Sequence, residues 1–275
     1  LAAILSRIGA AMQLPLLLFK RLCSSGTPSP FGRHAAGDDP LNSEFHPMCW
    51  SSVEPSRWRS SQVLRRTAVD IRSTVDTVQR VESGGGSATG VQVDVRDRDA
   101  VHAAISAAAE RAGGLDVLVT CAGIYGAVTT IDDLLPEDLD AVLGVNVAGT
   151  IWTDQAALPH LRRRGGRVVC VGSVAGRNGG LLSGPHYGAS KGGVHAFVRW
   201  LARIEAGNGI LANVIAPGPI DTPMLQGRGY TPDAIPLRRF GRAEEIASVA
   251  VFLASPGAGY ITGSIVDANG GSFVG

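Results

Sequence analysis

The sequence predicts an α/β fold in which helices cover both faces of a doubly wound parallel sheet. After about residue 62, short apolar runs typical of buried strands alternate with longer stretches of helical period. The 275 residues include 36 glycines and only 5% aromatic residues, a composition that suits many tight turns between strands and helices. We therefore expect one domain at residues 63–275, with ligands bound beyond the carboxyl ends of its strands.

The first half of this domain alternates strands with helices. Its strands are short apolar or alternating runs, and its helices are longer stretches that glycines end. In order, we expect a strand at residues 66–70, a helix at 73–82, a strand at 91–95, a helix at 99–111 and a strand at 115–120.

The second half continues this alternation and contains one long helical pattern, in which Pro136 suits the first turn. The expected elements are a helix at residues 136–161, a strand at 167–171, a helix at 187–206, a strand at 211–215, a helix at 243–254 and a strand at 263–267.

Residues 1–62 do not share this alternation, and we leave them unassigned. The part from 22 to 60 is rich in Pro, Ser, Trp and His and has no sustained period, which indicates an irregular or disordered segment. Residues 1–20 are apolar, but Arg7 and Pro15 interrupt them and the run is short for a membrane span. Because a secretory signal needs a charged start before its apolar run, we expect a cytoplasmic protein; a membrane anchor is the weaker alternative.

The charge and the cysteines argue against several functions. A net charge of +1 gives no attraction to nucleic acid or to an anionic membrane surface. The four cysteines, at positions 23, 49, 121 and 170, form no Cys-x-x-Cys pair, and no His cluster joins them. We therefore expect no metal site, no disulfide framework and reduced thiols.

A tyrosine and a lysine lie four residues apart in HYGASK, residues 186–191. On a helix this spacing puts Tyr187 and Lys191 on one face. A nearby ammonium lowers the pKa of a phenol, which would let Tyr187 exchange a proton with an alcohol oxygen. Taken alone, such a pair is more often an ordinary surface pair on an amphipathic helix.

Two polar residues elsewhere could join this pair. Ser173 follows the predicted strand at 167–171, where its hydroxyl could bind a substrate carbonyl; the alternative is a loop serine that caps a backbone group. Asn146 lies inside the long predicted helix, where asparagine is unfavourable. It could hold a water that connects Lys191 to solvent, or it could be a packing amide.

These residues and several further motifs follow one another in order along the chain. They are DV at 94–95, CAG at 121–123, Asn146, Ser173, YGASK at 187–191, APGPIDTP at 216–223, and the C-terminal stretches IPLRRFGRAEEI and YITGSIVDANGG. With these motifs, the chain from Ala68 onward resembles the short-chain dehydrogenase/reductase family, and most closely its 3-oxoacyl-carrier-protein reductase-like branch. The resemblance implies a Rossmann-type fold, NAD as coenzyme with NADP as the alternative, and a small carbonyl or secondary alcohol as substrate.

The resemblance also implies roles for these residues. Tyr187 would be the general acid/base, Lys191 would lower its pKa and hold the nicotinamide ribose, and Ser173 would orient the substrate oxygen. Asn146 would anchor the water of a proton relay. The other coenzyme contacts would be Asp70, Asp94, Val95, Cys121, Ala122, Gly123, Pro217, Gly218, Ile220 and Thr222. Residues 224–239 would form a mobile lid, and the helices at 136–161 and 187–206 would join subunits of a homodimer or homotetramer.

Asp70 indicates which coenzyme is preferred. It ends the predicted strand at 66–70, where a carboxylate can accept hydrogen bonds from both ribose hydroxyls and repel a 2′-phosphate. Asp70 therefore favours NAD over NADP. The arginines at 65, 66 and 72 weaken this preference, and Asp70 could instead cap the helix that follows.

One part of the family pattern is missing. A first strand followed by TGxxxGxG should lie about two dozen residues before Asp70, but no glycine occurs between Gly37 and Gly84. The cluster GGGSATG at 84–90 follows a helix and precedes a strand, so we interpret it as a turn. We expect the first β-α unit to be missing or replaced. One hypothesis is that residues up to about 62 come from a wrong reading frame, which an intact frame in the source DNA would refute.

A second departure concerns Cys121, which stands where the family usually has Asn. A thiol cannot make the two-sided hydrogen bonds of an amide, so the rigidity of this turn is in doubt. Two classes of function stay open. All four catalytic positions indicate an NAD(P)-dependent oxidoreductase, whereas the missing glycine loop favours a catalytically inactive, truncated relative that cannot bind dinucleotide.

Overall fold

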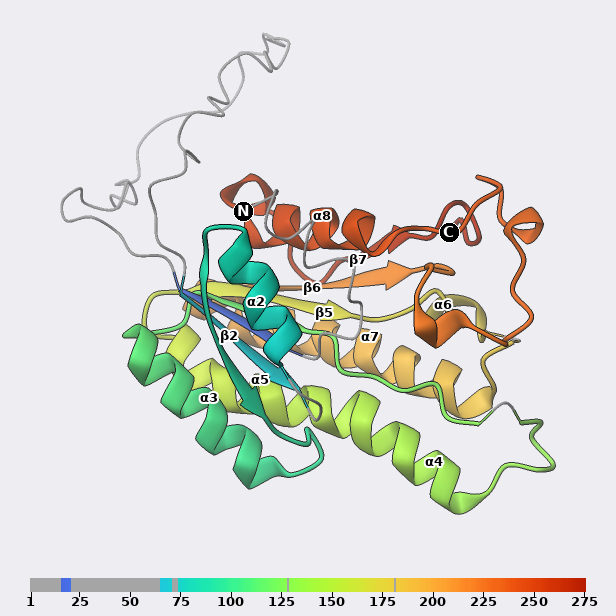
Figure 1. The fold of residues 1–275 in the computed structure, drawn as a ribbon, viewed down its shortest axis with the longest axis horizontal. Coiled ribbons are helices and arrows are strands. Elements are labelled where there is room, and N and C mark those ends of the chain that lie inside the picture. Colours follow the sequence, from blue (N-terminus) through green and yellow to red (C-terminus); the bar gives the residue numbers. More distant parts are fainter. Residues whose placement is uncertain (1–15, 21–64, 71–73, 128, 181) are drawn as a thin grey trace, which may run out of the picture.

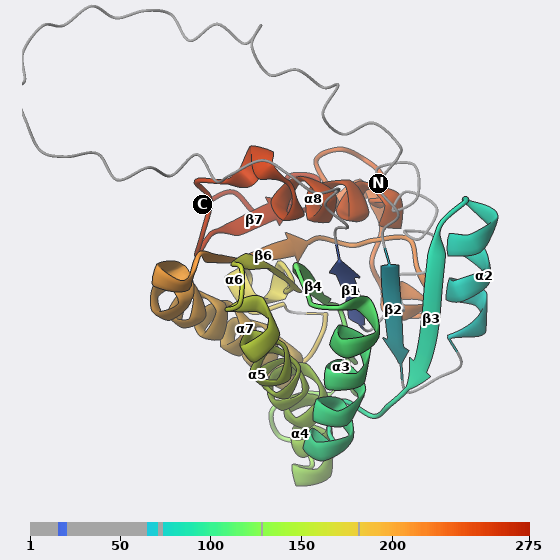
Figure 2. The same cartoon turned by 90° about the vertical axis from the view of Figure 1, so that its left-hand side faces the viewer.

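The computed structural model describes residues 16–20, 65–70, 74–127, 129–180 and 182–275 (Figure 1). Its centre is one seven-stranded sheet with the strand order β3-β2-β1-β4-β5-β6-β7. Helices α2 and α8 pack on one face of this sheet, and α3, α5 and α7 pack on the other (Figure 2). The predicted doubly wound α/β fold is confirmed.

The elements follow the predicted order from residue 65 onward. The strands are β1 (Leu16–Lys20), β2 (Arg65–Asp70), β3 (Ser87–Gln92), β4 (Val117–Thr120), β5 (Gly166–Val171), β6 (Ile210–Pro217) and β7 (Ile265–Ala268). The helices are α2 (Val75–Ser83), α3 (Arg98–Ala112), α4 (Pro136–Leu143), α5 (Gly149–Leu161), α6 (Ala175–Asn178), α7 (Pro185–Glu205) and α8 (Ala243–Ala254). The short helix α6 was not predicted.

The strand expected at 91–95 lies earlier in the chain, at Ser87–Gln92. Its register pairs Asp70 with Gln92, so the ladder with β2 ends there. Val93 and Val95 follow this end and are buried in the core beneath α3 and α5. The alternating pattern that predicted a strand therefore reflects burial of these two valines beyond the ladder.

The first strand of the sheet corrects two expectations. Residues 1–62 were expected to be irregular, but Leu16–Lys20 forms β1 between β2 and β4. This strand runs antiparallel to both neighbours, so the predicted all-parallel sheet is mixed. Without it, the facing backbone groups of β2 and β4 would lack ladder partners in the middle of the sheet. The rest of the 1–62 segment lies outside the described residues.

The direction of β1 decides what lies near the ligand-binding edge. Leu16 pairs with Val69 and Thr120, near the carboxyl ends of β2 and β4, whereas Lys20 pairs with Arg65 at the opposite end. In the expected β-α unit, the first strand would end at the carboxyl edge and turn into a phosphate-binding loop. Here β1 begins at that edge, and the predicted loss or replacement of the β-α unit stays a prediction.

The long helix predicted at 136–161 is continuous but contains a defect. Between α4 and α5, residues Gly144–Ala148 form a π-helical turn. Such turns are rare and occur frequently at functional sites. Asn146 lies in this turn and is fully buried, so the unfavourable residue in the helix marks the place where its geometry changes.

Candidate active site

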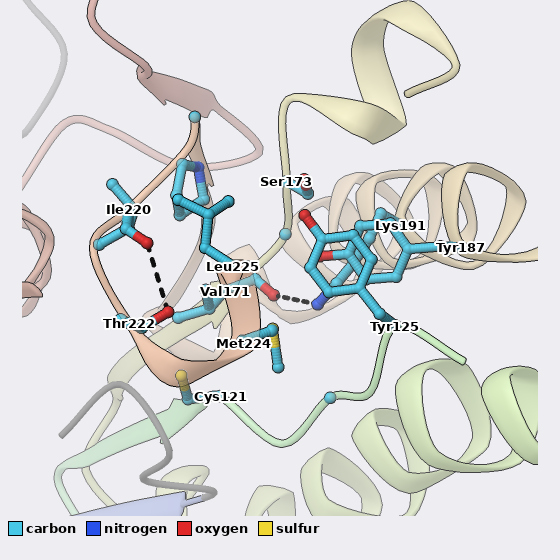
Figure 3. Close-up of a pocket in the computed structure, with 14 residues that line it drawn as sticks. Cys121, Tyr125, Val171, Ser173, Tyr187, Lys191, Ile220, Thr222, Met224 and Leu225 are labelled. Atoms are coloured by element: carbon cyan, nitrogen blue, oxygen red, sulfur yellow. Dashed lines mark hydrogen bonds between the residues drawn. The ribbon is translucent and has the colours of Figure 1, made fainter. Parts of the chain in front are cut away.

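A pocket opens at the carboxyl ends of β4, β5 and β6, beside the start of α7 (Figure 3). The space within it and at its open mouth, solvent included, is about 560 Å³. Parallel sheets of this kind bind ligands at this edge. The lining residues are Cys121, Gly123, Tyr125, Val171, Gly172, Ser173, Tyr187, Lys191, Pro217, Gly218, Ile220, Thr222, Met224 and Leu225.

Most of the predicted site residues belong to this lining. Five others do not line it: Asp70, Asp94, Val95, Ala122 and Asn146. The predicted lid supplies Met224 and Leu225, from a short 3₁₀ turn at Pro223–Leu225.

Helix α7 positions Tyr187 and Lys191 on one face, as their spacing predicts. Both side chains are buried, and the Lys191 Nζ lies 5.7 Å from the centroid of the Tyr187 ring. This ammonium donates a hydrogen bond of 3.0 Å to the carbonyl of Val171, the last residue of β5. Lys191 is therefore fixed by the sheet and faces the pocket beside the tyrosine (Figure 3).

The proton affinity of Tyr187 differs from the expectation. Burial raises the pKa of Tyr187 to about 12, and a hydrogen bond with the Ser173 side chain opposes this shift. The predicted lowering by Lys191 is not what the structure shows. Burial also lowers the pKa of Lys191 itself, and its ammonium is engaged by the Val171 carbonyl rather than by the phenol oxygen.

Ser173 caps a backbone group, one of the two interpretations that the sequence left open, and its predicted contact with a substrate carbonyl stays a prediction. Its hydroxyl accepts a hydrogen bond of 3.1 Å from the Ala175 N–H, which makes it a backbone cap at the start of α6. The same hydroxyl bonds to Tyr187, at the pocket. Beneath it, the Ser173 N–H lies 3.5 Å from Nε2 of His195 and donates to it.

His195 was not identified from the sequence. It follows Tyr187 and Lys191 by the same interval of four residues on α7, a spacing that places all three on one helix face. It is 3% exposed, and burial lowers its pKa to about 4. The imidazole is therefore neutral near pH 7, and it supports the turn that carries Ser173.

Asn146 clamps the backbone of the turn after β4. Its Oδ1 accepts from the Ile124 N–H at 2.8 Å, and its Nδ2 donates to the Ile124 carbonyl and to Ser190 Oγ, each at 2.9 Å. Its side chain is thus committed to protein groups, and its main-chain carbonyl accepts from the Thr150 hydroxyl at 2.8 Å. The packing-amide interpretation describes these contacts, and the predicted water anchor stays a prediction.

Gly123 lies close to the side chains of Lys191 and Asn146. A Cβ at this position would come within 3.3 Å of Lys191 Nζ and 3.4 Å of Asn146 Oδ1. The neighbouring Cys121 thiol also faces the pocket, and burial raises its pKa. The negative charge of Asp70 contributes in the same direction, so Asp70 lies within electrostatic reach of this turn.

Two of the residues expected to contact the coenzyme, Asp94 and Val95, are engaged elsewhere. The carboxylate of Asp94 forms an ion pair of 2.5 Å with Arg96, whose hydrogen bond lowers the pKa of Asp94. Val95 is buried against α5, where a Cβ at Gly149 would lie 2.6 Å from its Cγ2. Neither side chain faces the pocket in this structure.

Tyr125 is the main pocket residue that the sequence did not reveal. Its ring stacks on that of Tyr187, with centroids 4.1 Å apart and an interplanar angle of 15° (Figure 3). The guanidinium carbon of Arg228 lies 4.3 Å from the centroid of the same ring. Tyr125 occupies a loop without periodicity, so only the short distance from the CAG motif could have drawn attention to it.

The side chains fit one half of a nicotinamide dinucleotide. Lys191 has three donor positions, and one is used on a protein carbonyl in the described part of the chain. Lys191 and Gly123 both line the pocket, and the absence of a side chain at Gly123 leaves the space beside the ammonium unfilled. For the pyrophosphate half, the described residues supply no glycine-rich turn after β1, because β1 begins at this edge.

Among the described residues, none of the helices combines the length and the apolar character that a membrane span requires. No group of three or more His, Cys, Asp or Glu side chains in the same residues is placed to hold a metal ion.

Comparison with known proteins identifies relatives over this region. Residues 64–272 match a family model described as enoyl-(acyl carrier protein) reductase. The short-chain reductase protein NovJ of Streptomyces niveus is 38% identical over 224 residues, which cover 76% of this chain and 82% of that protein. The 3-oxoacyl-[acyl-carrier-protein] reductase FabG of Thermotoga maritima is 37% identical over 204 residues, or 70% of this chain and 80% of that protein. A solved NADH-dependent reductase responsible for alginate metabolism superposes with a TM-score of 0.67 at 30% identity, covering 74% and 83% of the two chains.

Proposed function

This chain belongs to the short-chain dehydrogenase/reductase family, and from that premise we propose that it transfers hydride between NAD and a small carbonyl or secondary alcohol compound, with Tyr187 as general acid/base. The observation that carries the proposal is the convergence of Tyr187, Ser173 and Lys191 on one pocket at the carboxyl edge of the sheet. The family itself supports an oxidoreductase that uses NAD or NADP.

The nicotinamide ring, when bound, supplies the hydride in reduction and accepts it in oxidation. The chain supplies the proton. In reduction, the phenol of Tyr187 donates its proton to the substrate oxygen as the carbonyl becomes an alcohol, and in oxidation it takes that proton back. The Ser173 hydroxyl, already bonded to Tyr187, holds the substrate oxygen beside the phenol. Lys191 keeps two donor positions for the ribose hydroxyls.

Other residues would hold the coenzyme. Gly123 gives the close approach beside Lys191, and the turn after β6 would enclose the nicotinamide through Pro217, Gly218, Ile220 and Thr222. Cys121 and Ala122 would line the path toward the adenosine. We keep Asp94 and Val95 as adenine contacts through their backbone only, since their side chains are engaged elsewhere.

Asp70 supports NAD over NADP. It is the last residue of β2, at the carboxyl edge, and its charge reaches Cys121 in the turn after β4. A carboxylate there accepts hydrogen bonds from ribose hydroxyls and repels a phosphate. In Asp70→Ser, this repulsion disappears, so the preference for NADH over NADPH should narrow.

Turnover tests the proposal. The purified chain is incubated with NADH and a panel of small ketones, and with NAD⁺ and the corresponding secondary alcohols, while the absorbance of NADH is followed. We expect carbonyl-dependent oxidation of NADH that Tyr187→Phe reduces by about 10²-fold or more, because this variant lacks the proton to transfer. Equal rates in Tyr187→Phe and wild type would refute the role of Tyr187.

A second candidate function rests on a different observation. The antiparallel β1 removes the usual position of the phosphate-binding turn, which favours a non-catalytic relative that cannot hold dinucleotide. This candidate predicts a folded chain with no coenzyme binding, whereas the oxidoreductase predicts binding even where no ketone of the panel is reduced. A cytoplasmic location and a homodimeric or homotetrameric assembly stay predictions.

A further inference from the structure

The segment after β6 is fixed at its base. Ile220 and Gly241 form an isolated parallel bridge, and the Asp221 N–H donates to the Gly241 carbonyl at 2.9 Å. The Gly241 N–H donates in turn to Pro219 at 3.0 Å. The chain between these points is a closed loop that carries Met224 and Leu225 over the pocket. The contacts at the base do not hold the first part of this loop, which includes Arg228.

Arg228 is the loop residue that reaches across the pocket edge. Its guanidinium carbon lies 4.3 Å from the centroid of the Tyr125 ring, and its Nη2 donates to the Gly126 carbonyl at 3.2 Å. Tyr125 and Gly126 belong to the turn after β4, and Tyr125 lines the same pocket as Met224 and Leu225 of the loop. No ion pair between Arg228 and a carboxylate occurs in the described part of the chain.

The Tyr125 ring is covered on both faces. Tyr187 lies 4.1 Å from its centroid with nearly parallel planes, and the Arg228 guanidinium lies 4.3 Å from the same point. Two flat groups this near cannot occupy one face together, so the order of the stack is Arg228, Tyr125, Tyr187. Planar guanidinium groups stack on aromatic faces in this way.

The backbone around Arg228 is adapted to this position. Gly227 and Gly229 flank it with φ angles of +73° and +74°, a region that other residues rarely adopt. A Cβ at either glycine would meet no atom within 4 Å, so it is the backbone conformation that calls for glycine there. Both glycines therefore allow the chain to turn the arginine inward.

We propose that Arg228 is the latch of the lid: by stacking on Tyr125 it holds residues 222–230 closed over the pocket, and through Tyr125 it fixes the ring of Tyr187. Arg228 is a positioning residue, since it acts on Tyr187 through another side chain. The latch itself stands on the geometry of the stack. Its consequence for the reaction rests on the proposed function, because the ring that it fixes is the proposed proton donor.

Limited proteolysis tests the latch without coenzyme or substrate. Chymotrypsin is added to the native 275-residue chain, and mass spectrometry follows cleavage after Leu225 and Tyr230. When opening is fast relative to cleavage, the cleavage rate reports the population of the open lid. We expect Arg228→Gln to be cleaved about 3- to 30-fold faster than wild type, the range that loss of a cation–π contact implies. Arg228→Lys should lie between them, because an ammonium keeps the charge but not the flat stack.

Matched variants separate the stack from other effects. Tyr125→Phe keeps the ring but loses the contact of 3.5 Å between the Tyr125 and Tyr230 hydroxyls, so it shows what that contact alone contributes. Tyr125→Leu also loses the stack and should be cleaved faster than Tyr125→Phe. Arg163→Gln removes an exposed arginine at the turn before β5 and should change nothing. The acceleration of cleavage in the double variant of Tyr125→Leu and Arg228→Gln should be smaller than the product of the two single effects, since both substitutions remove the stack.

Two outcomes would overturn the latch. One is an Arg228→Gln lid that is cleaved as slowly as wild type. The other is a double variant whose acceleration equals the product of the two single effects, because the side chains would then act independently. Thermal unfolding of each variant shows whether cleavage reports the lid or general unfolding, and Tyr125→Phe provides the conservative comparison if Tyr125→Leu does not fold. If Arg228→Gln is cleaved faster than wild type but the chain binds no coenzyme, the result supports the latch and refutes only the proposed function.

Discussion

Tyr187 is a buried phenol with opposing influences on its proton affinity. Burial raises its pKa to about 12, and Tyr230 and Cys121 act in the same direction. The Ser173 hydrogen bond and the charge of Arg228 lower the pKa. The phenol is therefore protonated near neutral pH, which suits donation of a proton in reduction more than removal of one in oxidation.

The pH dependence of turnover should show the contribution of Ser173. Ser173→Ala removes the hydrogen bond that lowers the pKa of Tyr187, so the phenolate becomes scarcer at any given pH. We expect the rise of the alcohol oxidation rate with pH to move to higher pH in this variant. The rate of carbonyl reduction should not fall for this reason, because the protonated phenol that reduction needs becomes more abundant. Ser248→Ala, whose exposed hydroxyl bonds to the Glu244 carbonyl, serves as control. An unshifted oxidation profile in Ser173→Ala would contradict the assignment.

Asp154 is a buried carboxyl that the proposed reaction does not use. It is fully buried on α5, its Oδ2 lies 3.8 Å from the Cys170 Sγ, and burial raises its pKa from 3.8 to about 8. Between these values the folded chain keeps a proton that the unfolded chain has lost. The free energy of unfolding therefore falls as pH rises through this window.

Asp154→Asn should remove this pH dependence, since an amide does not titrate. We expect the variant to gain stability relative to wild type from pH 5 to pH 8, by up to about 1.4 kcal/mol per pH unit. Thermal unfolding at several pH values measures the difference, with exposed Asp132→Asn as control. A difference that stays constant with pH would show that Asp154 is ionised in the folded chain.

At the scale of single elements, the π turn between α4 and α5 links the helix to the pocket. It presents Asn146, whose side chain bonds to both backbone groups of Ile124. Ile124 directly precedes Tyr125, so the clamp fixes the turn that carries the stacked ring. A helical defect in one element therefore sets the position of a loop in another.

Asn146→Ala should loosen this turn. The Ile124 N–H and carbonyl lose their partner, which costs about 1–3 kcal/mol where such groups stay unpaired. We expect a lower melting temperature together with weaker NADH binding, both relative to the control Asn178→Ala. The Asn178 side chain accepts a hydrogen bond from the Gly180 N–H at an exposed site. A less stable variant with unchanged NADH affinity would mean that the clamp does not shape the coenzyme site.

The lid depends on the two left-handed glycines that flank Arg228. Gly227→Ala places a Cβ in open space but at a φ of +73°, which costs about 1–2 kcal/mol. We expect faster chymotryptic cleavage of the lid, by about fivefold or more. Gly207→Ala is the matched control, because a Cβ there also meets open space and its φ is not left-handed. Equal cleavage of the two variants would show that the inward turn needs no glycine.

At the scale of the whole molecule, the sequence predicted the fold well from residue 65 onward. Strands such as β5 and helices such as α7 have strong periodicity, and the motifs at their ends placed Ser173, Tyr187 and Lys191 in one pocket. Tyr125 and Arg228 could not be predicted, because they meet through loops that no period describes. The antiparallel β1 also could not be predicted from the sequence, since its position depends on pairing with strands distant in the chain.

Coenzyme binding by the 275-residue chain is the most direct test of the proposed oxidoreductase function. NADH and NADPH are titrated against the purified protein, and their fluorescence is followed, with Lys191→Met as the variant that lacks the ribose donor. We expect saturable binding with NADH preferred, and weaker binding by Lys191→Met. A folded protein that binds neither nucleotide would contradict this expectation, and the chain would then be a family member that keeps the tyrosine, serine and lysine of the pocket without a coenzyme.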